Sequence, residues 1–229
     1  MKKAVVEIRD LAFAWPGGDA VLDLPALTIR EGERVFIKGP SGSGKSTLLG
    51  LLAGIQTANH GTLEVLGQPL ARLSGRARDH FRAANLGYIF QQFNLLPFLS
   101  VQDNVTAALT FSPAKRARLQ GSPEQEARRL LAELQLPDEA LHRPVHALSI
   151  GQQQRVAAAR ALIGSPPLVI ADEPTSALDT DNRAAFIKLL FEECDKQGST
   201  LIFVSHDPYL EPLFPRVENL QQLNRRATC

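Results

Sequence analysis

The sequence predicts an α/β fold in which a core of alternating strands and helices is interrupted by a helical insertion. Three observations support this prediction. The short strand Arg34–Lys38 runs into a glycine-rich turn that is followed by a helical segment. The apolar run Leu168–Ala171 has the length and composition of a buried parallel strand. Residues 101–163 carry mostly helical periodicity, so we expect them to form the insertion.

The N-terminal part of the chain contains mainly strand signals. Val5–Trp15 is rich in β-branched, aromatic and alternating residues, and a Pro-Gly-Gly sequence ends it. Lys45–Ala53 is predicted to be a helix that stops at Gly54. Two further strands are expected at Thr62–Leu66 and Leu86–Phe90.

The C-terminal part places a helix between strands. Asp181–Lys196 is predicted to be amphipathic, because apolar residues recur at positions i, i+3, i+4 and i+7. These residues are Ile187, Leu190, Phe191 and Cys194. Gly198 is a candidate for the residue that ends this helix, and Thr200–Val204 is a predicted buried strand.

Composition and charge limit the classes of function. The chain of 229 residues has 25 basic and 24 acidic residues, so its net charge gives no support for nucleic-acid binding. Its two cysteines, Cys194 and Cys229, are too few for a disulfide framework and suit a reducing cytoplasm. The N-terminal residues lack the apolar region of a signal peptide, and the longest apolar stretch, near Leu48–Ile55, is too short to cross a bilayer. We therefore expect another chain to supply any membrane-spanning part.

The glycine-rich turn matches the phosphate-binding pattern G-x-x-x-x-G-K-[ST]. The loop and the two residues after its lysine are Gly39, Pro40, Ser41, Gly42, Ser43, Gly44, Lys45, Ser46 and Thr47. Glycines let backbone N–H groups face one anion, and the following helix adds its positive end. Lys45 is expected to reach the β- and γ-phosphates of a nucleotide, and Ser46 to ligate Mg²⁺. The alternative, a flexible Gly/Ser turn, is disfavoured by the complete motif and its strand–helix context.

Two carboxylates follow the apolar strand Leu168–Ala171. Asp172 is a candidate to hold Mg²⁺, directly or through water, and Glu173 is a candidate to polarise an attacking water. Acidic residues at strand ends are common, so this signal alone is weak. Together with the phosphate loop, it predicts a nucleotide-hydrolysing site.

The segment Leu148–Arg155 reads LSIGQQQR. Ser149 and Gln152 have the S-x-x-Q spacing of a capping box, which predicts a helix that begins after Ser149. The N-terminus of a helix is a site for anions. On capping alone, an ordinary capped helix is an equally good interpretation.

This segment resembles the LSGGQ signature of ABC (ATP-binding cassette) ATPases, and the other motifs follow in that family's order from Val5 to Asp207. The resemblance implies one ABC ATP-binding domain over residues 1–229, with the α/β fold of phosphate-loop NTPases and an N-terminal antiparallel β region. Residues 1–92 and 164–229 would form its RecA-like core, and residues 93–163 its helical signature subdomain. Ile150 departs from the family, which usually has glycine there, and we expect function to be kept.

The resemblance also implies roles for single residues. Gln91 fits the glutamine that senses Mg²⁺ and the γ-phosphate, and His206 fits the switch histidine. Trp15 fits the aromatic residue that stacks on adenine, with packing at a strand end as the alternative. Asp179 fits the loop that crosses the dimer interface. The expected catalytic residues are Lys45, Gln91, Glu173 and His206, the expected Mg²⁺ ligands are Ser46, Gln91 and Asp172, and the expected contacts to ATP on a second subunit are Ser149, Gly151 and Gln152.

Within the family, the segment Leu86–Pro97 together with Arg82, Asn104 and Val105 is similar to the LolD, MacB and FtsE group. The resemblance implies a motor that uses ATP and Mg²⁺ and forms a head-to-tail homodimer around two ATP molecules. Its expected partner is a separately encoded FtsX- or MacB-like integral membrane permease, and its expected location is the cytoplasmic face of the inner membrane. Its task would be export, lipoprotein release or force transmission. A regulatory FtsE-like role in cell-wall hydrolysis shares every motif.

Other classes of protein have less support. A DNA-maintenance ABC ATPase would insert coiled coils or a zinc module, and the chain has neither sustained heptads nor a Cys₄ cluster. A small-molecule kinase would have no use for Leu148–Gln152. The basic clusters Lys115–Arg118 and Arg128–Arg129 are expected to be solvated helix faces rather than a nucleic-acid surface.

Two further segments carry expectations of a different kind. Phe93–Leu99 holds five large apolar residues in seven positions. The family resemblance implies that they form a groove that receives a short helix of the membrane subunit, with a buried strand or helix as the alternative. Residues 210–229 lack the closing strands and glycine turn of the group. The resemblance therefore implies nothing for this last segment.

Overall fold

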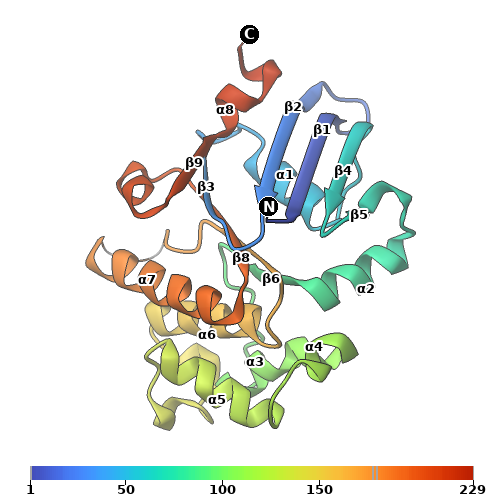
Figure 1. Ribbon diagram of the computed structural model, residues 1–229. Coiled ribbons are helices and arrows are strands. Elements are labelled where there is room, and N and C mark those ends of the chain that lie inside the picture. The colour runs from blue at the N-terminus through green and yellow to red at the C-terminus, as the bar shows by residue number, and fades with distance from the viewer. Residues whose placement is uncertain (1, 177, 179, 229) are drawn as a thin grey trace. The chain divides into compact units, whose positions relative to one another are not determined.

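The computed structural model describes residues 2–176, 178 and 180–228, with the side chains of all of these except 180, 181, 227 and 228. Contacts divide the chain into two units. The first unit consists of Met1–Arg82 and Thr200–Cys229, and the second of Ala83–Ser199 (Figure 1). The chain therefore leaves the first unit once and returns to it near its end.

An antiparallel sheet forms the N-terminal part of the first unit. Its strands are β1 (Ala4–Ala14), β2 (Ala20–Arg30), β4 (His60–Val65) and β5 (Gln68–Pro69), in the order β2-β1-β4-β5 (Figure 1). In β1, apolar residues are buried at alternate positions on each side of an irregularity near Asp10. These residues are Val6, Ile8, Leu11 and Phe13. The predicted antiparallel β region is thereby confirmed.

Parallel strands form the other sheet region of the first unit. β3 (Arg34–Lys38) pairs with β8 (Thr200–Ser205) on one side and with β9 (Arg216–Asn219) on the other. The expectation that residues 210–229 lack a closing strand is therefore wrong. β9 is short and holds only one apolar side chain, Val217, so the sequence pattern of a buried strand is missing there.

The core of this region is aromatic. Phe36 of β3, Phe203 of β8 and Phe214 lie with ring centroids 5.0, 5.1 and 5.9 Å apart. Phe36 and Phe203 are completely buried, so replacing either by alanine should cost about 3–5 kcal/mol of stability. The α-helices described in this unit are α1 (Lys45–Leu52), which buries Leu48–Leu52, the beginning of α2 (Gly75–Asn85), and α8 (Leu220–Leu223).

Two parallel strands belong to the second unit. β6 (Leu86–Ile89) pairs with β7 (Leu168–Asp172), and Ile89 lies opposite Ala171. β7 is buried along its apolar residues, as predicted for a parallel strand.

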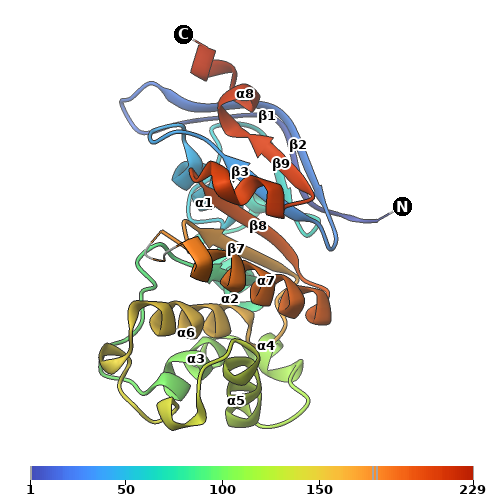
Figure 2. The ribbon, with the colours of Figure 1, turned by 90° about the vertical axis from the view of Figure 1, so that its left-hand side faces the viewer.

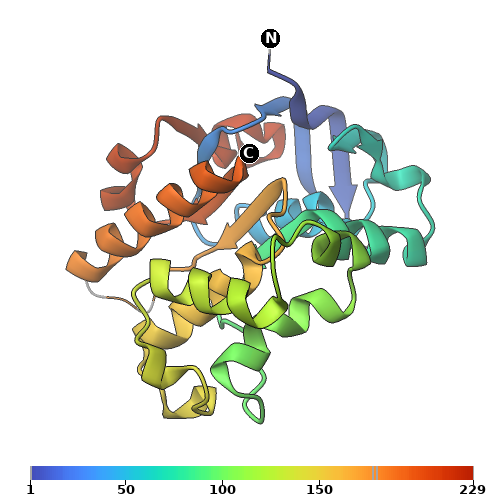
Figure 3. The same cartoon turned by 60° about the horizontal axis from the view of Figure 1, so that its bottom comes forward.

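Helices form the rest of the second unit. They are α3 (Val101–Thr110), α4 (Pro113–Ala117), α5 (Pro123–Glu133), α6 (Ile150–Leu162) and α7 (Thr180–Gln197). α3, α5 and α6 pack against one another and α6 also contacts α7 (Figures 2 and 3). Ile187, Leu190 and Cys194 of α7 are buried and Phe191 is half-buried, which confirms three of the four residues of the predicted apolar face. Within the described part of the chain, no helix has both the length and the apolar character needed to cross a membrane.

The structure groups these helices with the strands that flank them. Contacts join α3–α6 with β6, β7 and α7 in one unit. A separate helical subdomain over residues 93–163 therefore stays a prediction.

Candidate functional site

The predicted site residues fall into two groups, one in each unit. The first unit holds the phosphate loop, Trp15 and His206. The second holds Gln91, the Asp172–Glu173 pair and the signature segment, defined as Leu148–Arg155. Asp179 lies outside the described residues.

Lys45 folds back over the phosphate loop. Its Nζ donates to the carbonyl oxygens of Gly39 and Pro40 at 2.7 and 2.9 Å. The ammonium group is thereby held above the loop, where an anion would approach. Hydrogen bonds to an ionised phosphate are stronger than bonds to neutral carbonyls, so a nucleotide can replace these partners.

Gly44 fixes the junction between the loop and α1. Its φ of 93° lies in the left-handed region, which favours glycine. A Cβ atom at Gly44 would lie 2.7 Å from Leu22 Cδ2 and 3.5 Å from Val21 Cγ1. Side chains of β2 therefore close this side of the loop. Gly44 offers no side-chain cap, so the first N–H groups of α1 remain available to an anion.

Hydroxyl groups complete the loop. Ser43 Oγ is buried, and among the described residues it has no hydrogen-bond partner. An orphaned buried hydroxyl requires a partner from a ligand or water, so the loop fits a bound phosphate. Ser46 is exposed in the first turn of α1, and Thr47 beside it is half-buried. The Ser46 hydroxyl is the kind of oxygen ligand that Mg²⁺ prefers.

Trp15 follows the end of β1. It is 46% exposed, and its ring meets Phe13 edge-on at a centroid distance of 5.1 Å. The neighbouring ring holds the indole in place while much of its surface stays accessible. This arrangement suits a stacking platform better than a packed core residue.

His206 leaves its sheet at the same edge as the phosphate loop. Lys38, the last residue of β3, lies opposite Ser205, the last residue of β8. Gly39 and His206 follow these paired residues directly, and His206 is exposed. The carboxyl edge of a parallel sheet is the common place for ligands, so the first unit brings these two predicted site elements together.

The second unit brings together the residues that follow β6 and β7. Ile89 and Ala171 are paired, so Gln91 and Asp172 leave the two strands at the same edge. Burial and the charge of Asp172 raise the pKa of Tyr88, which indicates that the carboxylate lies near this phenol. Gln91 is exposed. Glu173 is only 7% exposed and has a φ of 46°, a backbone conformation that is uncommon outside glycine.

The predicted capping box of the signature segment is confirmed. Ser149 precedes α6, and its Oγ accepts a hydrogen bond from the N–H of Gln152 at 3.3 Å. Gln152 Oε1 accepts one from the N–H of Ser149 at 3.0 Å. Ser149, Gly151 and Gln152 line a pocket of about 450 Å³ together with Leu178, and a Cβ atom at Gly151 would lie 3.4 Å from Leu178 Cδ2. The helix N-terminus therefore opens into a pocket beside the predicted dimer-interface loop.

Ile150 occupies the first turn of α6 and is 54% exposed. Its side chain therefore fills none of the core of the second unit. The capping bonds of Ser149 are present with isoleucine at this position, so the departure from the usual glycine leaves the helix start intact.

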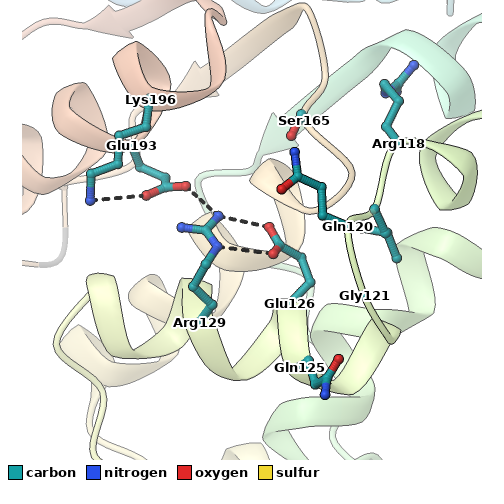
Figure 4. A pocket seen from close by; sticks show the side chains of 10 residues that line it. Arg118, Gln120, Gly121, Gln125, Glu126, Arg129, Ser165, Glu193 and Lys196 are labelled. Atoms are coloured by element: carbon teal, nitrogen blue, oxygen red, sulfur yellow. Dashed lines mark hydrogen bonds and ion pairs between the residues drawn. The ribbon is translucent and has the colours of Figure 1, made fainter.

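Another pocket of about 450 Å³ lies in the second unit among charged side chains (Figure 4). Arg129 bonds Glu126 and Glu193 at 2.8 and 2.7 Å, and Lys196 lies 3.8 Å from Glu193. Glu193 is almost completely buried, so these ion pairs neutralise its charge and connect α5 with α7. The charges are paired within the protein, although Glu193 Oε2 accepts no hydrogen bond from the described residues, and we assign no ligand to this pocket.

One residue of the basic clusters is less solvated than expected. Lys115 is only 4% exposed, and its Nζ donates to the carbonyl oxygen of Leu86 at 2.7 Å. Burial lowers its pKa to about 8. Arg118 is exposed, although it donates to the carbonyl oxygens of Gly164 and Ala84 at 2.7 and 2.6 Å. The prediction of solvated helix faces is therefore wrong for Lys115, which joins α4 to β6.

The apolar segment Phe93–Leu99 contains both buried and exposed side chains. Phe93 is 8% exposed, whereas Leu96 and Phe98 are 39% and 78% exposed. The segment forms no regular strand or helix.

Sequence reasoning missed β2 entirely, and with it Val21 and Leu22 beside the phosphate loop. The apolar residues Leu22, Leu24, Leu27 and Ile29, which are all buried, were the available signal.

Comparison with protein families gives one match over most of the chain. A family model described as "ABC transporter" matches residues 22–176. This span includes the phosphate loop, Gln91, the signature segment and the Asp172–Glu173 pair.

Curated relatives match nearly the whole chain. The macrolide export ATP-binding/permease protein MacB of Shigella flexneri is 38% identical over 216 residues, which are 93% of this chain and 32% of that protein. The protein of the same name from Psychrobacter cryohalolentis is 39% identical over 219 residues, which are 94% of this chain and 32% of that protein. The chain therefore spans about a third of the length of these relatives.

Solved structures share the fold. The ATP-binding cassette MJ0796, a dimer in a post-hydrolysis state bound to ADP and Pi, superposes with a TM-score of 0.82 and 32% identity over 93% of each chain. The protein cbiO1 from Clostridium perfringens, part of the ABC transporter complex cbiONQ, superposes with a TM-score of 0.83 and 27% identity over 95% of this chain and 85% of that chain.

Proposed function

Because the chain belongs to the ABC transporter family of ATP-hydrolysing cassettes, we propose that two copies bind two ATP molecules head-to-tail and drive a membrane permease. One observation carries this proposal. The same chain provides two helix N-termini. One follows the phosphate loop and has no side-chain cap, and the other begins the signature helix and lines a pocket. Each is suited to an anion, so each nucleotide would lie between the loop of one copy and the signature of the other.

The first half of each site binds the nucleotide. Residues 39–47 would surround the phosphates, with Lys45 moving from the carbonyls of Gly39 and Pro40 to the β- and γ-phosphates. Trp15 would stack on adenine with its exposed face. His206 would contact the γ-phosphate, since it leaves β8 at the edge where the loop leaves β3.

The residues at the ends of β6 and β7 perform the chemical step. Glu173 would orient the attacking water and take its proton. Asp172 and Gln91 would hold Mg²⁺ together with Ser46, and their carboxylate, amide and hydroxyl oxygens fit this ion. When bound, Mg²⁺ would neutralise phosphate charge during transfer.

The signature segment and the adjoining loop complete the site of the second copy. Ser149, Gly151 and Gln152 would contact the γ-phosphate of the ATP that the other copy holds, and Asp179 would cross the dimer interface. The cassette MJ0796 is a dimer with ADP and Pi bound, which supports a nucleotide-bound pair of copies.

The membrane partner would contact the exposed apolar side chains of Phe93–Leu99. Leu96 and Phe98 are exposed and lie outside any helix or strand, as expected of a docking surface. The relatives named MacB are described as macrolide export ATP-binding/permease proteins, which supports an FtsX- or MacB-like permease and an export-type role. The cassette would then act at the cytoplasmic face of the membrane.

Replacing Glu173 by glutamine tests the catalytic assignment. Glu173→Gln removes the general base with almost no change of shape, so hydrolysis should fall by about 10²–10⁴-fold while ATP binding remains. The ATP-bound dimer should then accumulate on size-exclusion chromatography. Glu192→Gln on α7 is the matched control, because Glu192 is 51% exposed and remote from β7 in sequence. Glu173→Gln hydrolysing ATP at the rate of Glu192→Gln would assign the base to another residue.

A further inference from the structure

Residues 216–226, here called the tail, contact the beginning of the phosphate loop. β9 pairs with β3 so that Asn219 lies opposite Lys38, the residue before the loop. Leu220 follows and is completely buried. A Cβ atom at Gly39 would lie 3.6 Å from Leu220 Cβ, so the tail packs directly against the first glycine of the loop.

Asn224 attaches the same tail to β2. Its Oδ1 accepts a hydrogen bond from the N–H of Asp23 at 2.8 Å, and its Nδ2 donates to the carbonyl oxygen of Val21 at 2.9 Å. β2 is the end strand of its sheet, and α8 lies near it in the first unit (Figure 1). A side-chain amide has the same donor and acceptor as a peptide group. Asn224 therefore takes the place of a neighbouring strand along this edge.

The part of β2 that Asn224 binds packs against Gly44 of the phosphate loop. Between the two bonded residues lies Leu22, whose Cδ2 is 2.7 Å from the position of a Cβ atom at Gly44. Val21 Cγ1 lies 3.5 Å from the same Cβ position. The tail thus contacts one end of the loop through Leu220 and supports the other end through Asn224 and β2.

The tail has two other attachments to this sheet. Arg216 donates to the carbonyl oxygen of Thr28 at 2.9 Å, in a part of β2 beyond the residues that contact Gly44. Arg225 lies 3.8 Å from Asp10 of β1 and from Asp23 of β2, and its side chain is 57% exposed. Exposed ion pairs at such distances contribute little. Asn224 is 4% exposed, so its two bonds to β2 are partly shielded from water, and their loss would deprive the half-buried N–H of Asp23 and carbonyl of Val21 of these partners.

We propose that Asn224 is a positioning residue for nucleotide binding. It holds Val21–Asp23 against Gly44, so that the phosphate loop keeps the curvature that directs its N–H groups to one anion. This inference rests on the proposed nucleotide site of the same chain. Without the amide, β2 would move away from the loop, and the loop would have to be ordered by the nucleotide itself. Binding would weaken while the chemical step, carried by other residues, would not.

Three variants test the role of Asn224. Asn224→Leu keeps the size and removes both bonds to β2, together with the bond that Asn224 Oδ1 accepts from the N–H of Arg226 at 3.3 Å. Asn224→Asp keeps the acceptor for the N–H of Asp23 and loses the donor to Val21. Gln222→Leu is the control, because Gln222 is an exposed amide of the same tail. The measurements are ATP titration, and KM and kcat of hydrolysis, at a temperature where circular dichroism shows each variant folded.

We expect both Asn224 variants to raise the dissociation constant and KM for ATP by about tenfold, which corresponds to about 1.4 kcal/mol, with kcat unchanged. Gln222→Leu should match wild type. If a folded Asn224 variant binds ATP as tightly as Gln222→Leu does, the inference is overturned. If wild type itself fails to bind ATP, the proposed function fails instead.

A measurement on the wild type covers the case in which neither Asn224 variant folds. Coupling between sites is reciprocal, so ATP should also tighten the contact between the tail and β2. Hydrogen exchange at the N–H of Asp23, which bonds Asn224, should become slower when ATP is added. Exchange that slows at the phosphate loop but not at Asp23 would refute the link.

Discussion

Ser122 and Ser149 each form a capping box at the start of a helix in the second unit, and only Ser149 lies in the signature segment. Ser149 Oγ accepts from Gln152 at 3.3 Å, and Gln152 Oε1 accepts from Ser149 at 3.0 Å. Ser122 and Gln125 make the same two bonds before α5, at 3.2 and 3.0 Å. Ser149→Ala and Ser122→Ala therefore form a matched pair of variants.

Both variants should destabilise the fold to the same extent. Replacing a capping serine by alanine costs about 1 kcal/mol, within a range of about 0.5–2 kcal/mol. For a protein of this size, 1 kcal/mol corresponds to a fall in melting temperature of about 2–4 °C. Thermal unfolding followed by circular dichroism measures this effect, and similar bond lengths at the two caps predict similar losses.

Hydrolysis should separate the two variants. A hydrogen bond to a charged group contributes about 1.5–3 kcal/mol, so loss of the Ser149 contact to the γ-phosphate should lower kcat/KM by about 10- to 100-fold. Ser122→Ala should keep the wild-type rate, because α5 lies outside the predicted site. Equal rates for the two variants would show that the signature helix does not bind nucleotide, and that Ser149 is only a helix cap.

Three other perturbations test separate parts of the structure. Burial lowers the pKa of Lys115 from 10.5 to about 8, so between these values the unfolded chain binds more protons than the folded one, and stability should rise with pH. The difference in unfolding free energy between wild type and Lys115→Met should follow this rise, and a constant difference from pH 8 to 10.5 would contradict it. Ile150→Gly should leave ATP hydrolysis unchanged or modestly faster, since the cap stays in place, and a large fall in kcat would identify Ile150 as a required contact. Leu96→Asp and Phe98→Asp should abolish co-purification with the membrane subunit while basal hydrolysis by the isolated chain continues. Phe111→Asp is the control at equal exposure, 76% against 78% for Phe98, and a loss of hydrolysis in either docking variant would place those side chains in the core.

Features that depend on near neighbours in sequence were predictable. The capping box of Ser149 and Gln152 needs residues three positions apart, and the structure confirms it. The left-handed conformation of Gly44 follows from a loop that must curl back before a helix. The buried face of α7 follows from helical periodicity. In each case the residues that form the structural feature are close together in sequence, so the feature is visible as a sequence pattern.

Features that depend on distant residues were not predictable in this way. Asn224 binds backbone groups 201 and 203 positions away, and no local pattern distinguishes it from the exposed amides nearby. Lys115 belongs to a basic cluster in sequence but bonds Leu86, 29 positions away. Its burial is decided by how the helices pack. A cluster of charged residues in the sequence therefore indicates solvent-exposed side chains only where tertiary packing does not bury them.

The helix caps distinguish ends that serve the fold from an end that fits a ligand. Serines precede α3, α4, α5 and α6, at positions 100, 112, 122 and 149, and each accepts a hydrogen bond from the residue three positions on. α1 follows Gly44 instead, which has no side chain to accept a bond. Nucleotide phosphates would supply the missing acceptor, so ATP should stabilise the first unit.

The signature helix combines both tasks at Ser149. Aspartate caps a helix as well as serine does, but a carboxylate at this position would repel the γ-phosphate. A hydroxyl that accepts from the N–H of Gln152 keeps its own proton for donation. The helix start is therefore stable without nucleotide and can still bind one. Ser149→Asp should accordingly keep the stability of the fold and lose the ATP-dependent dimer, in contrast to Ser149→Ala, which should lose part of both.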